Sequence, residues 1–375
     1  MLPVQNEINH PLAFYNRRTG RNRPRADSCF TAARPADLLA PLNDTVIRWI
    51  QSFGPQAPWV CVGIFLAASF LMIWRLESMS DAGLEGTVLG TLVMPYCSGL
   101  GNLVFAFVLG RAGGDSREVM INSLVNNITN LTLLIGLPAL FWGLSLTSEK
   151  SKKSAKGKSS GDDAQRVNRL SLLLTMIAAG FFTGVTWALG RDGTLDFTDG
   201  LVLVGTFLFW QAVHVIEVLK KSGPQKNLFG FLFVVDLALL LVGAYAVYVS
   251  TDFLVSWVRG LRGGFVAQHL GWVSGWLMVV PNAMLALYYG ATRRAEVVYS
   301  SQVGDGHICL PLCLGVFAIF RPIAMPDFFQ LSMWVLLGAV GVHFVFVAVL
   351  GRLPRFMGAV FIAAYAVFVW KGLVK

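Results

Sequence analysis

The sequence predicts an all-α polytopic membrane protein, with about ten transmembrane helices in two inverted five-helix repeats. Three observations predict this fold class: the composition, the spacing of the hydrophobic runs, and a polar pattern that recurs in both halves of the chain. Of the 375 residues, 55% are hydrophobic and only 14% are charged. Because a soluble domain usually carries about 25% charged residues, we expect this chain to be embedded in a lipid bilayer, with lipids as partners.

Charge and motif content exclude several classes of function. The formal net charge is +9, but Lys and Arg lie between hydrophobic runs, where they act as topology signals rather than as a nucleic-acid surface. The five cysteines include no CxxC pair, which argues against a disulfide framework or a structural zinc site. The sequence has no P-loop, nucleophile elbow or HExxH motif. We therefore expect no enzyme activity, no cofactor and no nucleic-acid partner.

Ten hydrophobic runs are long enough to cross about 30 Å of hydrocarbon as helices. They lie near 59–74, 84–109, 119–146, 170–189, 199–219, 228–258, 266–290, 297–319, 328–350 and 355–373. A shorter run, 36–53, is interpreted as an interfacial helix at the end of an Arg-rich N-terminal arm, residues 1–58. The membrane part divides into a first half, 59–219, a short basic linker, 220–227, and a second half, 228–375.

The loops predict the orientation. Those that follow odd-numbered spans carry more than twice as many Lys and Arg residues as those that follow even-numbered spans. Cytoplasmic loops are enriched in these residues. We therefore expect the odd-numbered loops in the cytoplasm, both termini on the outer side, and the protein in the plasma (inner) membrane.

Spans 2 and 7 share one motif, and spans 3 and 8 share another. Span 2 reads GNLVFAFVLG from residue 101 and span 7 reads PNAMLALYYG from residue 281, so that Asn102 corresponds to Asn282. Span 3 reads NNITNLTLLIG from residue 126 and span 8 reads DGHICLPLCLG from residue 305. In both, a second polar residue follows the first by four positions and a Gly follows six later. The matched spacing indicates an internal repeat, over about 84–146 and 266–319.

The repeat predicts where the functional site lies. Five spans per half make the repeats inverted, which brings both motifs together near the membrane midplane, where spans 2, 3, 7 and 8 meet. A Gly or Pro beside a polar residue in mid-span, as at Gly101 and Pro281, is typical of a broken helix whose freed carbonyls coordinate a cation.

Asp305 is the only carboxylate at a repeated position, so it is our candidate for binding a cation or carrying a proton. Polar groups inside a span are costly unless they face a cavity or each other, and the amides at the repeated positions would supply neutral oxygen ligands. The predicted ion-binding residues are Asn102, Asn126, Asn130, Asn282, Asp305 and Cys309, with Asn127, Ser98, Gly101, Pro281 and His307 as secondary candidates. For the amides, the alternative is hydrogen bonding between helices. Cys309 has two interpretations: a small packing residue or part of a soft-metal site.

The first motif resembles that of the cation/calcium antiporter superfamily, whose best-known members are sodium/calcium exchangers. The family repeat begins G-T-S-x-P-E, and VVPNAMLALYYG matches it with Asn282 at the Glu position. GLGNLVFAFVLG matches it with Gly101 at the Pro position and Asn102 at the Glu position. Both Glu positions of the family are therefore Asn in this chain.

The second part of the family repeat reads G-S-N-x-x-[ND], with a Gly six residues later. VNNITNLTLLIG matches it at Asn127 and Asn130, with Asn126 at the Ser position. GDGHICLPLCLG keeps both glycines but has Asp305 at the Ser position and Cys309 where the family has Asp or Asn.

The resemblance implies ten spans in two inverted halves and a secondary cation antiporter, in which spans 1 and 6 slide against the rest to give alternating access. Calcium prefers several oxygens with net negative charge, so the two Glu-to-Asn differences imply a changed ion selectivity. The transported small inorganic cation is expected to be sodium, a proton or calcium. Two alternatives remain: a transport-inactive structural or regulatory membrane protein of the same fold, and a transporter of a soft metal or a small polar solute.

Overall fold

The computed structural model describes residues 35–81, 99–146, 160–221 and 231–374. The chain divides into two units, residues 1–44 and 45–375. Of the first unit the structure describes the beginning of helix α1 (Pro35–Gln51), which covers the segment predicted as an interfacial helix. The second unit contains the membrane helices and the candidate site.

The predicted fold class is confirmed. Inside a bilayer every backbone N–H and C=O must be paired within the protein, so long apolar runs fold as helices. The described ranges contain nine helices that are long and apolar enough to span a membrane, together with the shorter apolar helix α4 (Leu100–Arg111). Helix α4 is the described part of predicted span 2, whose first residues, 84–98, lie outside the described ranges.

The helical elements follow the predicted spans. In the first half they are η1 (Gly54–Gln56), α2 (Ala57–Asp81), α4, α5 (Arg117–Ile128), η3 (Thr129–Leu134), α6 (Ile135–Trp142), α7 (Ser160–Leu189), η5 (Gly190–Asp192) and α8 (Phe197–Lys221). In the second half they are α9 (Phe231–Gly260), α10 (Phe265–Gln268), α11 (Leu270–Ala291), α12 (Ala295–Ile308), η6 (Cys309–Cys313), α13 (Leu314–Phe320), α14 (Phe329–Leu350), α15 (Arg355–Val369) and η7 (Trp370–Val374).

Four two-residue strands reveal the symmetry of the two halves. Strand β1 (Leu144–Ser145), which follows α6, pairs antiparallel with β4 (Arg352–Leu353), which joins α14 to α15. Strand β3 (Ile323–Ala324), which follows α13, pairs antiparallel with β2 (Thr194–Leu195), which lies between α7 and α8. Each pair thus joins the end of one repeat helix to a loop of the other half, so the two pairs occupy corresponding positions in the two halves.

The glycine that ends each second motif makes the same contact in both halves. Gly136 in α6 faces Gly358 in α15, where an added Cβ would lie 3.1 Å from the Gly358 carbonyl oxygen. Gly315 in α13 faces Gly200 in α8, where an added Cβ would lie 3.1 Å from the Gly200 carbonyl oxygen. These repeated glycines therefore allow close backbone approach between helices, as small residues commonly do in membranes.

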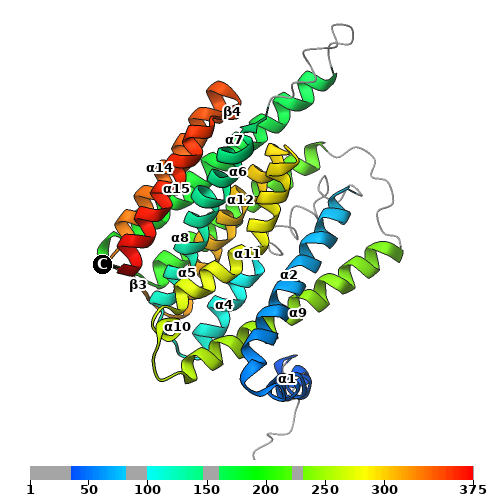
Figure 1. Ribbon diagram of the computed structural model, residues 1–375, viewed down its shortest axis with the longest axis vertical. Coiled ribbons are helices and arrows are strands. Elements are labelled where there is room, and N and C mark those ends of the chain that lie inside the picture. The colour runs from blue at the N-terminus through cyan, green and yellow to red at the C-terminus, as the bar shows by residue number, and fades with distance from the viewer. Residues whose placement is uncertain (1–34, 82–98, 147–159, 222–230, 375) are drawn as a thin grey trace, which may run out of the picture. The chain divides into compact units, whose positions relative to one another are not determined.

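Two helices lie at the centre of the second unit. In the most apolar window of residues 117–142, 78% of the residues are buried, and in that of residues 295–320, 72% are buried, whereas the other seven long helices give 22–50%. Helices α2 and α9 pack against each other, and Figure 1 shows them crossing on the side away from α14 and α15. The second motifs of both repeats are thus the most enclosed segments of the fold.

Candidate ion-binding site

Both central helices change to π-helix directly at the second motif. The π-helical segments are η3, between α5 and α6, and η6, between α12 and α13. In η6, Pro311 has no N–H to donate. In η3, the hydroxyls of Thr129 and Thr132 donate to the carbonyl oxygens four residues back. Both features weaken the regular α-helical pattern. Single π-helical turns are rare and often mark functional sites.

The helix break predicted beside Pro281 is absent, and for Gly101 the residues that precede helix α4, 82–98, lie outside the described ranges. Helix α11 runs unbroken from Leu270 to Ala291, through Pro281. In span 8 the helix is continuous too, although its hydrogen bonding changes at η6. Neighbouring helices re-satisfy the backbone groups that a proline frees, so this part of the expectation was wrong.

Asp305 is the centre of a buried polar cluster. Its Oδ2 atom accepts hydrogen bonds from the Nδ2 atoms of Asn126 (2.5 Å), Asn130 (2.8 Å) and Asn282 (3.4 Å). Asp305 is only 2% exposed, and the side chains of Asn126 and Asn130 are fully buried. Three predicted amides, from α5, η3 and α11, therefore meet at one carboxylate oxygen of α12.

Cys309 lies beside this cluster. Asn126 Nδ2 lies 3.2 Å from Cys309 Sγ, and the Ser123 hydroxyl donates to the Cys309 carbonyl oxygen at 3.4 Å. Two repeat helices are thus joined at the start of η6 by both a side-chain and a backbone contact.

Asn102 approaches the site from the other side of a small cavity. The cavity holds about 30 Å³ and is lined by Ser69 of α2, by Gly101 and Asn102 of α4, and by Pro281 and Asn282 of α11, together with Phe65, Met72, Ile73, Leu100, Val247 and Met278. A volume of this size is enough for about one water molecule. The two asparagines at the Glu positions of the family motif therefore line one common space.

Several oxygens of the cluster have no partner. Among the described residues, buried side-chain oxygens without a hydrogen bond include Oδ1 of Asn102, Asn126, Asn130 and Asp305, and Oε1 of Gln302. Each unsatisfied buried acceptor costs about 1–3 kcal/mol. A bound cation would satisfy such oxygens, because hard cations take oxygen ligands. The donor set thus fits a cation with one carboxylate and several neutral amides.

Two residues of the cluster were missed by the sequence analysis. Gln302 donates from Nε2 to the Asn282 carbonyl oxygen at 3.4 Å, and Ser123 bonds to Cys309 as described above. Ser123 lies three residues before Asn126, and Gln302 three residues before Asp305. They occupy equivalent repeat positions, so extending the repeat by one helical turn towards the N-terminus would have identified both.

The described secondary candidates form no hydrogen bond with the Asp305 carboxylate. Asn127 donates to the Ser123 carbonyl oxygen of its own helix at 2.7 Å, and its Oδ1 lies 2.8 Å from where a Cβ on Gly306 would stand. The Nε2 atom of His307 is 3.0 Å from the Thr175 carbonyl oxygen of α7. Gly101 and Pro281 line the cavity, and Ser98 lies outside the described ranges.

A family profile described as "Sodium/calcium exchanger protein" matches residues 58–215 and 235–371. This match covers most of the chain and both repeats. The chain belongs to the sodium/calcium exchanger protein family. No curated protein sequence matches this exchanger-family chain.

Solved structures of the sodium-calcium exchanger NCX_Mj share the fold of this family member. One, soaked with 10 mM Na⁺ and 10 mM Sr²⁺, has a TM-score of 0.57 at 19% identity, with 84% of this chain and 97% of that chain covered. Another, soaked with 2.5 mM Na⁺ and 0.1 mM Ca²⁺, has a TM-score of 0.56 at 20% identity, with 84% and 96% covered. A third, soaked without Na⁺ and Ca²⁺, has a TM-score of 0.51 at 19% identity, with 83% and 99% covered.

Proposed function

We propose that this chain is a secondary cation antiporter that works by alternating access and prefers a monovalent cation, sodium or a proton, over calcium. Its membership of the exchanger family supports cation antiport. The observation that carries the selectivity is the cluster around Asp305, in which a single carboxylate accepts from three amides.

The charge of the cluster favours a singly charged ion. One carboxylate balances one positive charge, whereas calcium sites usually combine several carboxylate and carbonyl oxygens. The described residues contain no group of three or more His, Cys, Asp or Glu side chains that could hold a metal ion. An ion at Asp305 would therefore take most of its ligands from neutral oxygens, and the free Oδ1 atoms of Asn126 and Asn130 are available for this.

Helices α2 and α9 are proposed to control access to the site. Both line the 30 Å³ cavity next to Asn102 and Asn282. A Cβ on Gly243 of α9 would lie 2.5 Å from Met72 Cγ of α2, and Arg75 forms a 3.2 Å ion pair with Asp236. This tight packing supports movement of the two helices as one body over the cavity.

The remaining alternatives make different predictions. A transport-inactive structural or regulatory protein would keep the fold without ion flux. A carrier of a soft metal would depend on the Cys309 thiol, which in the structure receives a contact from the Asn126 amide. The partially unsatisfied oxygen cluster favours the antiporter, because a purely structural cluster gains nothing from leaving buried acceptors unpaired.

We further propose that the protein resides in the plasma (inner) membrane. The Lys and Arg bias of the loops supports an orientation with the odd-numbered loops in the cytoplasm. In this setting it acts by transport and not as an enzyme. Small inorganic cations and lipids are its expected partners.

The test is ion flux into proteoliposomes containing the purified chain. Sodium, proton and calcium gradients would be imposed singly and in opposing pairs. We expect exchange that requires sodium or protons and is weak for calcium. Calcium exchange equal to sodium exchange would contradict the proposed selectivity, and absence of all flux would favour the structural alternative. Flux of a soft metal that is lost in Cys309→Ala would favour the soft-metal carrier.

A further inference from the structure

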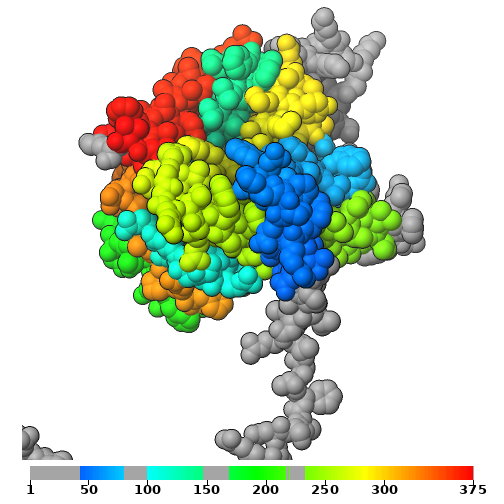
Figure 2. All heavy atoms as spheres, turned by 60° about the horizontal axis from the view of Figure 1, so that its bottom comes forward, coloured from blue at the N-terminus to red at the C-terminus, as the bar shows by residue number. Residues whose placement is uncertain are grey.

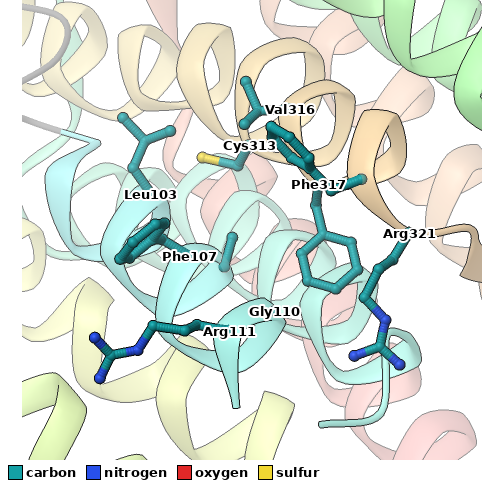
Figure 3. A pocket seen from close by; sticks show the side chains of 10 residues that line it. Leu103, Phe107, Gly110, Arg111, Cys313, Val316, Phe317 and Arg321 are labelled. Carbon is teal, nitrogen blue, oxygen red and sulfur yellow. The ribbon is translucent and has the colours of Figure 1, made fainter. Parts of the chain in front are cut away.

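A second cavity lies on the opposite face of α4, between α4 and α13. It holds about 300 Å³ and is lined by Leu103, Ala106, Phe107, Gly110, Arg111, Cys313, Val316, Phe317, Phe320 and Arg321. Figure 3 shows the apolar side chains along the groove and the two arginines at one end, with their guanidinium groups on opposite sides. The volume is at the lower end of the range for ligand pockets, about 300–1,000 Å³.

The two arginines place positive charge at one membrane face. Arg111 ends α4 and Arg321 directly follows α13, and Figure 2 shows the cyan residues around α4 against orange residues of the second half. Arg111 donates to Asp252 at 3.2 Å and to Tyr248 at 3.3 Å, and its side chain remains 58% exposed. The guanidinium of Arg321 has no hydrogen-bond or ion-pair partner within the described ranges. Since a guanidinium carries five N–H donors, both keep donors for a further ligand.

The inverted repeat provides an internal comparison for this groove. The repeat positions that correspond to Arg111 and Arg321 are Ala291 and Trp142. There, a Cβ on Gly290 would lie 2.6 Å from Pro138 Cβ and 3.3 Å from Trp142 Cε3. The first repeat thus has an aromatic side chain packed where the second has a cation beside a groove. The arginine pair is therefore not required by the helix architecture.

We propose that this groove binds an anionic phospholipid, with its headgroup at the end of the groove that Arg111 and Arg321 flank and one acyl chain along α4 and α13. Phosphate suits two guanidinium groups at the membrane face, because Arg binds phosphate oxygens in a planar, bidentate geometry. The groove runs along α4 from Arg111 to Leu103, which is about 12 Å of helix. Its apolar lining matches an acyl chain and not a second polar group.

The position of the lipid links it to the candidate ion site. Leu103 lines the groove, and its neighbour Asn102 lines the 30 Å³ cavity on the other side of α4. Cys313, at the bottom of the groove, ends the π-helical segment that begins at Cys309. A bound chain would therefore support the two segments that carry part of the ion site. Lipid binding itself does not depend on the proposed transport activity.

The test is competitive lipid binding to the purified full-length protein, measured by native mass spectrometry. The probe is an equimolar mixture of phosphatidylglycerol and phosphatidylcholine with identical acyl chains. We expect the natural chain to retain phosphatidylglycerol preferentially. In Arg321→Gln and in Arg111→Gln/Arg321→Gln this preference should fall, by roughly tenfold in the double variant, because each basic side chain near a membrane surface contributes substantially to attraction of anionic lipid. Arg321→Gln leaves the Arg111 ion pair intact and guards against misfolding.

Matched controls separate the groove from the general surface. Arg259, in the last turn of α9, and Arg262, which follows α9, are exposed and lie outside the groove. They are matched to Arg111 and Arg321 because even-numbered spans end at the same membrane face. Since they lie outside the groove, Arg259→Gln/Arg262→Gln should keep the preference for phosphatidylglycerol. Val316→Trp, which fills the groove, should reduce retention of both lipids, whereas Val345→Trp on exposed α14 surface should not. Glycerol phosphate, which lacks the chains, should not compete. Equal retention of the two lipids by the natural chain, or unchanged preference in the double variant, would overturn the proposal.

Discussion

The amide nitrogen of Asn130 lies 2.8 Å from the carboxylate oxygen Oδ2 of Asp305, so that the second motif of one repeat donates directly to the second motif of the other. Asn126 donates to the same oxygen at 2.5 Å. Since these amides already supply hydrogen bonds to Oδ2, the Oδ1 atom of Asp305 is left for another ligand. The single charge at this point determines what the site can hold.

Restoring carboxylates at the family's Glu positions should create calcium binding. We expect Asn102→Glu/Asn282→Glu to be stabilised by added Ca²⁺, because three carboxylates would then surround the site. At a calcium concentration one hundred times the dissociation constant, the gain is about 2.7 kcal/mol. Thermal unfolding of the detergent-solubilised protein with and without Ca²⁺ measures it. Gln330→Glu, on an exposed position of α14, is the control, and an equal calcium response in the control would contradict this account.

The glycine contact between α8 and α13 should not tolerate a methyl group. In Gly200→Ala the new Cβ would lie 2.7 Å from the Gly315 carbonyl oxygen and 2.8 Å from the Ile319 amide nitrogen, both of which are backbone atoms. Overpacking of this kind costs about 1–3 kcal/mol, so the unfolding temperature should fall. Gly205→Ala, on the same helix, has no atom within 4 Å of the new Cβ and should be close to neutral. Similar losses in both variants would argue against the close approach.

The Arg75–Asp236 ion pair should couple α2 to α9. The side chains are 19% and 14% exposed, so Asp236→Ala leaves a largely buried guanidinium unpaired. We expect a destabilisation of about 1–3 kcal/mol and slower transport. The exchanged pair Arg75→Asp/Asp236→Arg should recover part of both losses in unfolding and flux assays. No recovery in the exchanged pair would show that each residue acts separately.

His343 should support the π-helical segment of the first repeat. Its Nε2 atom lies 2.8 Å from the Leu131 carbonyl oxygen within η3, and the side chain is fully buried. His343→Leu should cost about 1–3 kcal/mol, because it removes a buried hydrogen bond to this carbonyl, whereas His343→Gln keeps a donor and should lose less. Chemical unfolding measures the loss of unfolding free energy in both variants. Equal losses would indicate that ring packing against Phe361 matters instead of the hydrogen bond.

Much of this fold could be predicted from sequence because a bilayer restricts the choices. Long apolar runs must form helices, and the recurrence of Asn102 at Asn282 and of Asn126 at Asp305 gave the repeat and the crossing point. The structure brings Asn126, Asn130, Asn282, Asp305 and Cys309 together, as the repeat predicted. The matched spacing of the polar residues was sufficient for this, because inverted repeats bring corresponding spans together near the midplane.

Other features depend on contacts that a sequence pattern does not contain. The π-helical segments arise from backbone hydrogen bonding around Pro311 and Thr129. Their apolar sequences do not differ from those of ordinary α-helical spans. Helical spacing already places His307 and Asp305 in different directions, but the partners of the His307 ring, Phe182 and Trp210, are visible only in the structure. The repeat spacing could have indicated Gln302, but its contact with the Asn282 carbonyl oxygen of a different helix is visible only in the structure.

The most direct test of the central claim is sodium uptake into proteoliposomes by the natural chain and by Asp305→Asn. Asp327→Asn, at an exposed position after span 8, is the matched control for loss of one carboxylate. We predict that Asp305→Asn folds, because Asn keeps the shape and a hydrogen-bonding oxygen, but loses sodium uptake, while Asp327→Asn retains it. Sodium uptake in Asp305→Asn equal to that of the natural chain would contradict the assignment of Asp305 as the ion-binding carboxylate.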